Sequence, residues 1–123
     1  MLKLFDVLVL PFYCALIYWL SDQPTLPMPM VFEIQDKLMH FAAYFIMSGL
    51  AWRAFRHFIP MPRVLMVASI LYSSLYGALD EWHQSFVEGR NPSGLDWAAD
   101  TVGAIAAMLL LAQFFRLQRQ SPT

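Results

Sequence analysis

The polar side chains of this sequence gather in one stretch, residues 80–103, between two long apolar runs. The stretch reads DEWHQSFVEGRNPSGLDWAADTVG and contains the carboxylates Glu81, Asp96 and Asp100. Carboxylates exchange protons in acid–base chemistry or hold a divalent metal, so these three are candidate catalytic residues. Arg90 has a planar donor fork that suits a phosphate or carboxylate, unless it forms an ion pair with Asp96 or Asp100. The stretch therefore predicts a polar site between two helix ends.

A second polar group lies earlier in the chain. Asp36, His40 and Tyr44 recur at every fourth position, which places them on one face if the segment is helical. Asp36 and His40 join the candidates for acid–base work or metal binding, although two ligands from one helix do not make a metal site. Lys37 is a candidate for holding a phosphate, and Tyr44 for binding a ligand.

The same spacing recurs at the end of the third apolar run. Tyr76, Asp80 and Gln84 are four residues apart and share one helical face. Tyr76 and Gln84 are candidates for ligand binding. The alternative role for both, and for Tyr44, is a hydrogen bond between neighbouring helices.

The composition indicates a membrane protein. Of 123 residues, 59% are hydrophobic and only 14% are charged, so the helices of a soluble domain would lack a polar face. The net charge of −1 gives no basic surface for nucleic acid. Cys14 is the only cysteine, which excludes a disulfide framework and a cysteine-based metal site.

The expected fold is an all-α membrane protein: one domain over residues 1–123, a compact bundle of four transmembrane helices with a polar cluster at their outer ends. The spans are expected at about residues 4–20, 37–56, 64–82 and 96–115. We expect the first to be a retained span, because Asp6 is out of place in a signal peptide and no cleavage site follows Leu20. The loop between the first and second spans contains three prolines, and we expect a short interfacial piece at Met30 to Ile34. Small residues at Gly49 and Gly103 should let helices approach closely.

The positions of the basic residues predict the orientation. With four spans, the side that holds the termini has six bases, Lys3, Arg53, Arg56, Arg63, Arg116 and Arg119, and the other side has two, Lys37 and Arg90. Positive charge favours the cytoplasm, so both termini are expected inside, in a multi-pass protein of the inner or cytoplasmic membrane. Arg53, Arg56 and His57 are expected to mark the exit of the second span into water. The polar cluster is then extracytoplasmic.

Three motifs in order resemble the VanZ-like family of small bacterial membrane proteins: DKxxHxxxY at 36–44, YGxxDExHQxFxxGR at 76–90 and DxxxDxxG at 96–103. The resemblance covers residues 36 to about 107. It implies an integral protein of the cell envelope, and the family is named for a member associated with resistance to the glycopeptide antibiotic teicoplanin. Glu88 stands where the family often has proline, and Asp100 where asparagine is frequent.

Three functions are compatible with these residues. The first is binding or modification of an envelope lipid or cell-wall precursor at the polar site, with the bilayer as the other partner. The second is an enzyme that acts on a lipid-linked phosphate with metal or acid–base help, although no HExxH motif or nucleophile elbow is present. The third is a non-catalytic structural or partner-binding role. The sequence identifies no cofactor, metal or oligomeric state.

Overall fold

A computed structural model describes residues 1–25, 29 and 34–120 of the chain. In these ranges the chain forms four α-helices and no strand: α1 (Leu2–Ser21), α2 (Gln35–Phe55), α3 (Pro62–Gln84) and α4 (Gly94–Gln120). The predicted all-α bundle is confirmed. Three of the helices, α1, α3 and α4, are long and apolar enough to cross a membrane. The expected interfacial piece at 30–34 lies, except for its last residue, outside the described part.

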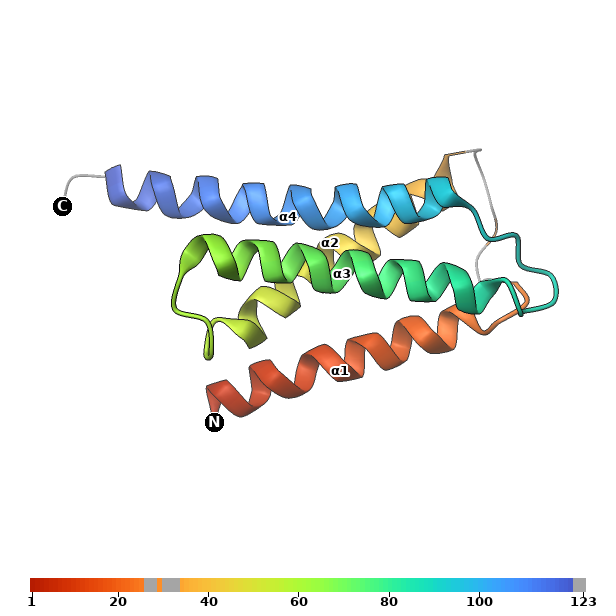
Figure 1. The fold of residues 1–123 in the computed structure, drawn as a ribbon, viewed down its shortest axis with the longest axis horizontal. Coiled ribbons are helices and arrows are strands. Elements are labelled where there is room, and N and C mark those ends of the chain that lie inside the picture. Colours follow the sequence, from red (N-terminus) through yellow and green to blue (C-terminus); the bar gives the residue numbers. More distant parts are fainter. Residues whose placement is uncertain (26–28, 30–33, 121–123) are drawn as a thin grey trace.

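The helices begin and end within about two residues of the expected spans, except at the end of α4. This helix was expected to end near residue 115 and continues to Gln120. Arg, Leu and Gln are strong helix formers, so the helix continues beyond its apolar part. The C-terminal turns of α4 extend past the start of α3 (Figure 1), and Arg116 and Arg119 line a pocket there together with Pro60 and Pro62.

The second helix crosses behind the others. In Figure 1, α1, α3 and α4 run side by side and α2 passes diagonally behind α3. α2 packs against each of the other three helices. Because its neighbours cover much of its surface, α2 can carry more polar residues than a helix surrounded by lipid. For this reason α2 is less apolar than α1, α3 and α4, the three helices whose length and composition suit a membrane span.

The bundle has two chemically different ends. At the first, called the site end, α1 and α3 finish and α2 and α4 begin. At the second, the termini end, lie the start of α1, the end of α4 and the connection between α2 and α3 (Figure 1). Between them, large apolar side chains point outward from α1, α3 and α4, among them Leu8, Phe12, Leu75, Leu79 and Leu109. Exposed apolar surface of this extent suits contact with lipid.

Close packing between α2 and α4 depends on Gly103. A Cβ atom added at Gly103 would lie 2.2 Å from the carbonyl oxygen of Phe41 in α2. The predicted close approach is therefore confirmed at this residue. The same prediction is wrong for Gly49, where an added Cβ would meet nothing within 4 Å. Gly49 lies on a face of α2 that no neighbouring helix closely approaches.

A buried ion-pair cluster joins α1 and α2 at the termini end. The Asp6 side chain is 0% exposed and accepts hydrogen bonds from Arg53 Nη2 at 2.5 Å and Arg56 Nη2 at 3.1 Å. His57 Nε2 lies 2.9 Å from the same carboxylate. Arg53, Arg56 and His57 were expected only to mark the exit of the second span into water, and this expectation is incomplete. They surround the single acid that the sequence places among the bases of this end.

Candidate functional site

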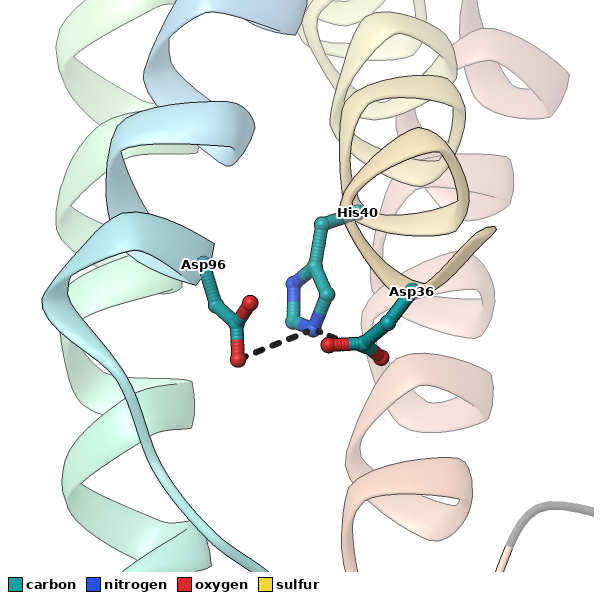
Figure 2. Close-up of side chains that lie close together, drawn as sticks. All are labelled: Asp36, His40 and Asp96. Carbon is teal, nitrogen blue, oxygen red and sulfur yellow. Dashed lines mark ion pairs between the residues drawn. The ribbon is translucent and has the colours of Figure 1, made fainter. Parts of the chain in front are cut away.

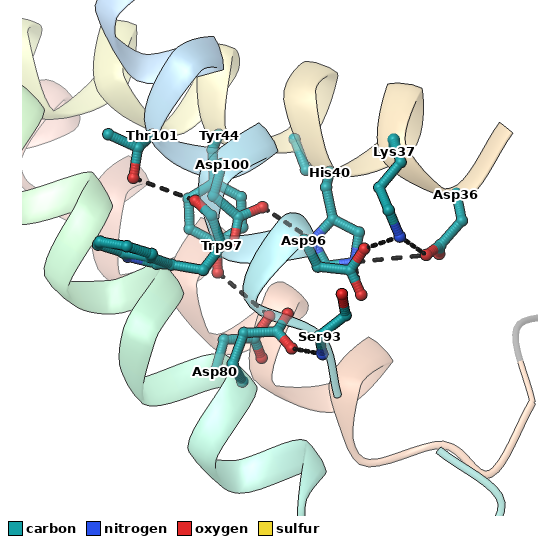
Figure 3. A network of polar contacts seen from close by, with 12 residues as sticks. Asp36, Lys37, His40, Tyr44, Asp80, Ser93, Asp96, Trp97, Asp100 and Thr101 are labelled. Carbon is teal, nitrogen blue, oxygen red and sulfur yellow. Dashed lines mark hydrogen bonds and ion pairs between the residues drawn. The ribbon is translucent and has the colours of Figure 1, made fainter. Parts of the chain in front are cut away.

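The polar residues of the site end come from three helices. α2 supplies Asp36, Lys37, His40 and Tyr44, α3 supplies Asp80 and Glu81, and α4 supplies Asp96 and Asp100. The start of α2, the end of α3 and the start of α4 meet here, so residues far apart in sequence become neighbours (Figure 3). All five candidate catalytic residues named from the sequence lie in this cluster.

His40 lies between carboxylates from two helices. Its Nδ1 atom is 2.8 Å from Asp100 Oδ1 (Figure 3). Its Nε2 atom is 3.9 Å from Asp36 Oδ1 and 3.8 Å from Asp96 Oδ2 (Figure 2). The His40 side chain is only 14% exposed. The stripe of Asp36, His40 and Tyr44 faces inward, as its spacing predicts. Carboxylates near both nitrogens stabilise the imidazolium form of the ring, which is suited to donate a proton.

Lys37 is already engaged by acids. Its Nζ atom donates to Asp96 Oδ1 and lies 3.4 Å from Asp36 Oδ2, so it links the first turns of α2 and α4 (Figure 3). A phosphate would have to share the ammonium group with both carboxylates. The structure therefore gives Lys37 a structural contact, and its binding of a ligand stays a prediction.

Tyr44 and Asp80 form the inner part of the cluster. The Tyr44 hydroxyl donates to Asp80 Oδ2 at 3.2 Å, and both side chains are buried. Asp80 was not among the site residues singled out from the sequence. The sequence does mark Asp80, because this acid directly follows the longest uncharged run of the chain. An ionisable group at membrane depth is costly and is usually retained for a function.

Tyr76 and Gln84 bond to α1 instead of to the acids. The Tyr76 hydroxyl donates to the carbonyl oxygen of Cys14 at 2.5 Å, and Gln84 Nε2 donates to Ser21 Oγ at 3.4 Å. These contacts match the alternative role, a hydrogen bond between helices. Gln84 also borders the pocket described below, whereas the Tyr76 hydroxyl points toward α1.

Glu81 and Asp100 each have one carboxylate oxygen fixed and one without a partner. The backbone N–H of Ser93 donates to Glu81 Oε2 at 2.8 Å, which ties the start of α4 to α3. Glu81 Oε1 and Asp100 Oδ2 are buried and have no hydrogen-bond partner among the described residues. The Asp100 side chain is 0% exposed. Oxygens in this state are costly unless a cation or proton satisfies them.

Arg90 binds the end of α1. Its Nη2 atom donates to the carbonyl oxygen of Leu20 at 2.8 Å, and its buried Nε atom has no partner among the described residues. The possible ion pair with Asp96 or Asp100 is therefore replaced by a helix-end contact. The preceding Gly89 has φ +85°, a conformation that glycine adopts without strain, and it lies against the backbone of Pro24.

A small pocket opens between these groups. It has a volume of about 80 Å³, and its polar lining is Asp36, His40, Tyr44, Asp80, Gln84 and Arg90, together with Ser21. Pockets for drug-sized ligands are several times larger, at about 300–1,000 Å³. It suits one compact group, such as a phosphate or a carboxylate, rather than a whole sugar.

Comparison with known proteins adds a family. A family model described as VanZ/LLP1 matches residues 5–116, nearly the whole chain. A search of curated proteins found no match, and a search of solved structures found none either.

Proposed function

The chain belongs to the VanZ/LLP1 family, and we propose that it is a multi-pass protein of the bacterial cytoplasmic membrane that binds an envelope lipid or a lipid-linked cell-wall precursor. Its three apolar helices support the membrane location. In this proposal α2 is a fourth span, whose polar residues are covered by α1, α3 and α4. Capture of a cell-wall precursor would also give a route to lower sensitivity to teicoplanin.

We place both termini in the cytoplasm and the site end outside. The six bases counted from the sequence lie at the termini end, on helix segments or, for Arg56, directly after α2, and only Lys37 and Arg90 lie at the site end. Positive residues favour the cytoplasmic side, and acids contribute little to this preference. The pairing of Asp6 with Arg53 and Arg56 therefore does not alter the argument.

Cysteine labelling in intact cells tests this orientation. In a Cys14→Ser background, Gln23→Cys and Asn91→Cys at the site end are expected to react with an impermeant thiol reagent added outside. Met61→Cys, in the connection between α2 and α3, is expected to react only after the cells are permeabilised. The opposite pattern would place the polar site in the cytoplasm.

The observation that carries the ligand proposal is the position of Arg90. One guanidinium nitrogen is anchored on Leu20, Nε is free of partners among the described residues, and the side chain lines the 80 Å³ pocket. A guanidinium fork held in place suits a phosphate, because it offers two parallel donors with little loss of side-chain freedom. The apolar faces of the helices outside the pocket suit the lipid tail.

A lipid pair that differs only in its head group tests this proposal. Protein in detergent micelles is expected to bind undecaprenyl phosphate at least tenfold more tightly than undecaprenol, as measured by native mass spectrometry. Arg90→Gln should lose about 10- to 100-fold of the affinity for the phosphate, since a hydrogen bond to a charged group contributes about 1.5–3 kcal/mol. Arg63→Gln, an exposed base at the termini end, is the matched control. Equal binding of the two lipids, or unchanged binding by Arg90→Gln, would contradict the proposal.

Catalysis on the bound phosphate is the second candidate. The observation that favours it is the position of His40, with Asp100 at one ring nitrogen and Asp36 and Asp96 near the other. Carboxylates at both nitrogens stabilise the imidazolium, which can act as a general acid and protonate the leaving oxygen of the lipid while water attacks the phosphorus. Release of inorganic phosphate from a lipid-linked substrate, abolished by His40→Gln at unchanged lipid binding, would establish turnover.

A further inference from the structure

Three residues of the site end converge as a set of metal ligands. One donor atom each from His40, Glu81 and Asp100 lies within 4.8 Å of the others. The three come from α2, α3 and α4, so a cation held by them would tie three helices together. We propose that this set binds a divalent transition-metal ion.

The unpartnered oxygens provide the independent support. Asp100 is fully buried, and its Oδ1 atom is fixed by His40 while its Oδ2 atom has no partner among the described residues. Glu81 repeats this arrangement, because Oε2 is fixed by the Ser93 N–H and the buried Oε1 has no partner in the same part of the chain. Each carboxylate is thus held in orientation by one oxygen and offers the other. A cation between them would satisfy both free oxygens at once.

The packing of α3 keeps the free oxygen of Asp100 in place. A Cβ atom added at Gly77 would lie 2.8 Å from Asp100 Oδ2, so this oxygen rests against α3 where the side chain is smallest. Glu81 is four residues further along the same helix, hence on the same face one turn later. Both oxygens therefore lie along the contact between α3 and α4.

The charges of the cluster also favour a cation here. The cluster contains five carboxylates, Asp36, Asp80, Glu81, Asp96 and Asp100, and the ion pairs within it come only from Lys37 and His40 among the described residues. Lys37 neutralises Asp36 and Asp96, the outer pair. Asp36, His40 and Asp96 also lie within ligand distance of one another (Figure 2), but Lys37 already occupies one oxygen of each of these two carboxylates. Deeper in the cluster, Asp100 pairs with His40 through Oδ1 alone, and Glu81 has no ion pair among the described residues.

The donor types indicate the kind of metal. One imidazole nitrogen with two carboxylates suits Zn²⁺ or Mn²⁺, whereas Mg²⁺ and Ca²⁺ prefer oxygen ligands alone. A cation in this position would also reconcile an acidic site with an anionic ligand, since it can bridge the carboxylates and a phosphate. Only this last step rests on the proposed function, and binding of the metal itself requires no lipid.

Metal content measured without lipid tests the inference. Tag-free protein is stripped with EDTA, equilibrated with Zn²⁺ or Mn²⁺, desalted and analysed by mass spectrometry of the metal. We expect about one equivalent for the parent chain, and at least tenfold weaker binding for Asp100→Asn and for Glu81→Gln. Glu88→Gln, an exposed glutamate in the loop before α4, should bind like the parent. Failure of the parent to bind either metal, or unchanged binding by both carboxylate variants, would overturn the assignment.

A spectroscopic measurement keeps the test valid if a variant does not fold. The chain has three histidines, so pulsed electron paramagnetic resonance of Mn²⁺ on protein with ¹⁵N-labelled histidine reports nitrogen coordination directly. The coupling is expected in the parent chain and in His83→Gln, and it should vanish in His40→Gln. A parent spectrum without nitrogen coupling, or coupling that persists in His40→Gln, would overturn the assignment. Because no lipid is present, the result is independent of lipid binding.

Discussion

The variant Gly103→Ala is expected to lose about 3 kcal/mol of stability, because overpacking against backbone cannot be relieved by a side-chain rotation. The added Cβ would lie 2.2 Å from the Phe41 carbonyl oxygen and 3.1 Å from its Cα atom. The two helices must therefore move apart. In a membrane this is especially costly, since helix association depends on close packing rather than on the hydrophobic effect.

Gly49→Ala is the matched control for this prediction. It makes the same chemical change in α2, where an added Cβ meets nothing within 4 Å, so a gain of up to about 1 kcal/mol is expected from helix propensity. Unfolding in mixed micelles with increasing dodecyl sulfate, followed by circular dichroism, would compare the two. Separation of α2 from α4 also separates His40 from Asp100, so Gly103→Ala should weaken metal binding as well. Equal stability of the two variants would contradict the prediction.

The helices and their inward faces could be predicted from the sequence because they depend on local pattern. Apolar runs of adequate length gave the four helices, and the spacing of Asp36, His40 and Tyr44 gave the face that points inward. The gathering of the acids at one end also followed, since each lies at the same end of its helix. These properties need only the helical repeat and the alternation of direction from one helix to the next.

The choice of partners within the site could not be predicted in the same way. Arg90 was expected to meet either an acid or a ligand, and it meets the Leu20 carbonyl because the loop before α4 brings it to the end of α1. Tyr76 shares a helical face with Asp80, yet its long side chain reaches the Cys14 carbonyl in α1. Such contacts depend on helix rotation and crossing angle, which spacing along one helix does not determine.

Asp6 carries a further signal in the sequence, which the argument against a signal peptide does not use. An acid near the start of α1 and bases at the end of α2 must lie at the same end of two antiparallel helices. A buried carboxylate at that depth needs compensation, and Arg53, Arg56 and His57 are the groups within reach. The cluster therefore fastens the first helix to the rest of the bundle. Its effect on stability should be measurable.

Replacing Asp6 with asparagine is expected to cost about 3 kcal/mol, the lower end of the range for breaking a buried ion pair, because Arg53 and Arg56 can still reach water. Asp22→Asn is the control: its carboxylate is 57% exposed and pairs only with His83 among the described contacts, so a change within about 0.5 kcal/mol is expected.

A double variant distinguishes an ion-pair cluster from simple loss of packing. Arg53→Gln alone should cost about 1 kcal/mol, since Asp6 keeps its contacts with Arg56 and His57. If the charges act together, Asp6→Asn combined with Arg53→Gln will cost clearly less than the sum of the two single changes, because the second change removes a cation that the first has left unpaired. The same dodecyl sulfate titration measures all four proteins. Strict additivity would show that Asp6 and Arg53 are not coupled, and this ion pair would then have no part in holding α1 against α2.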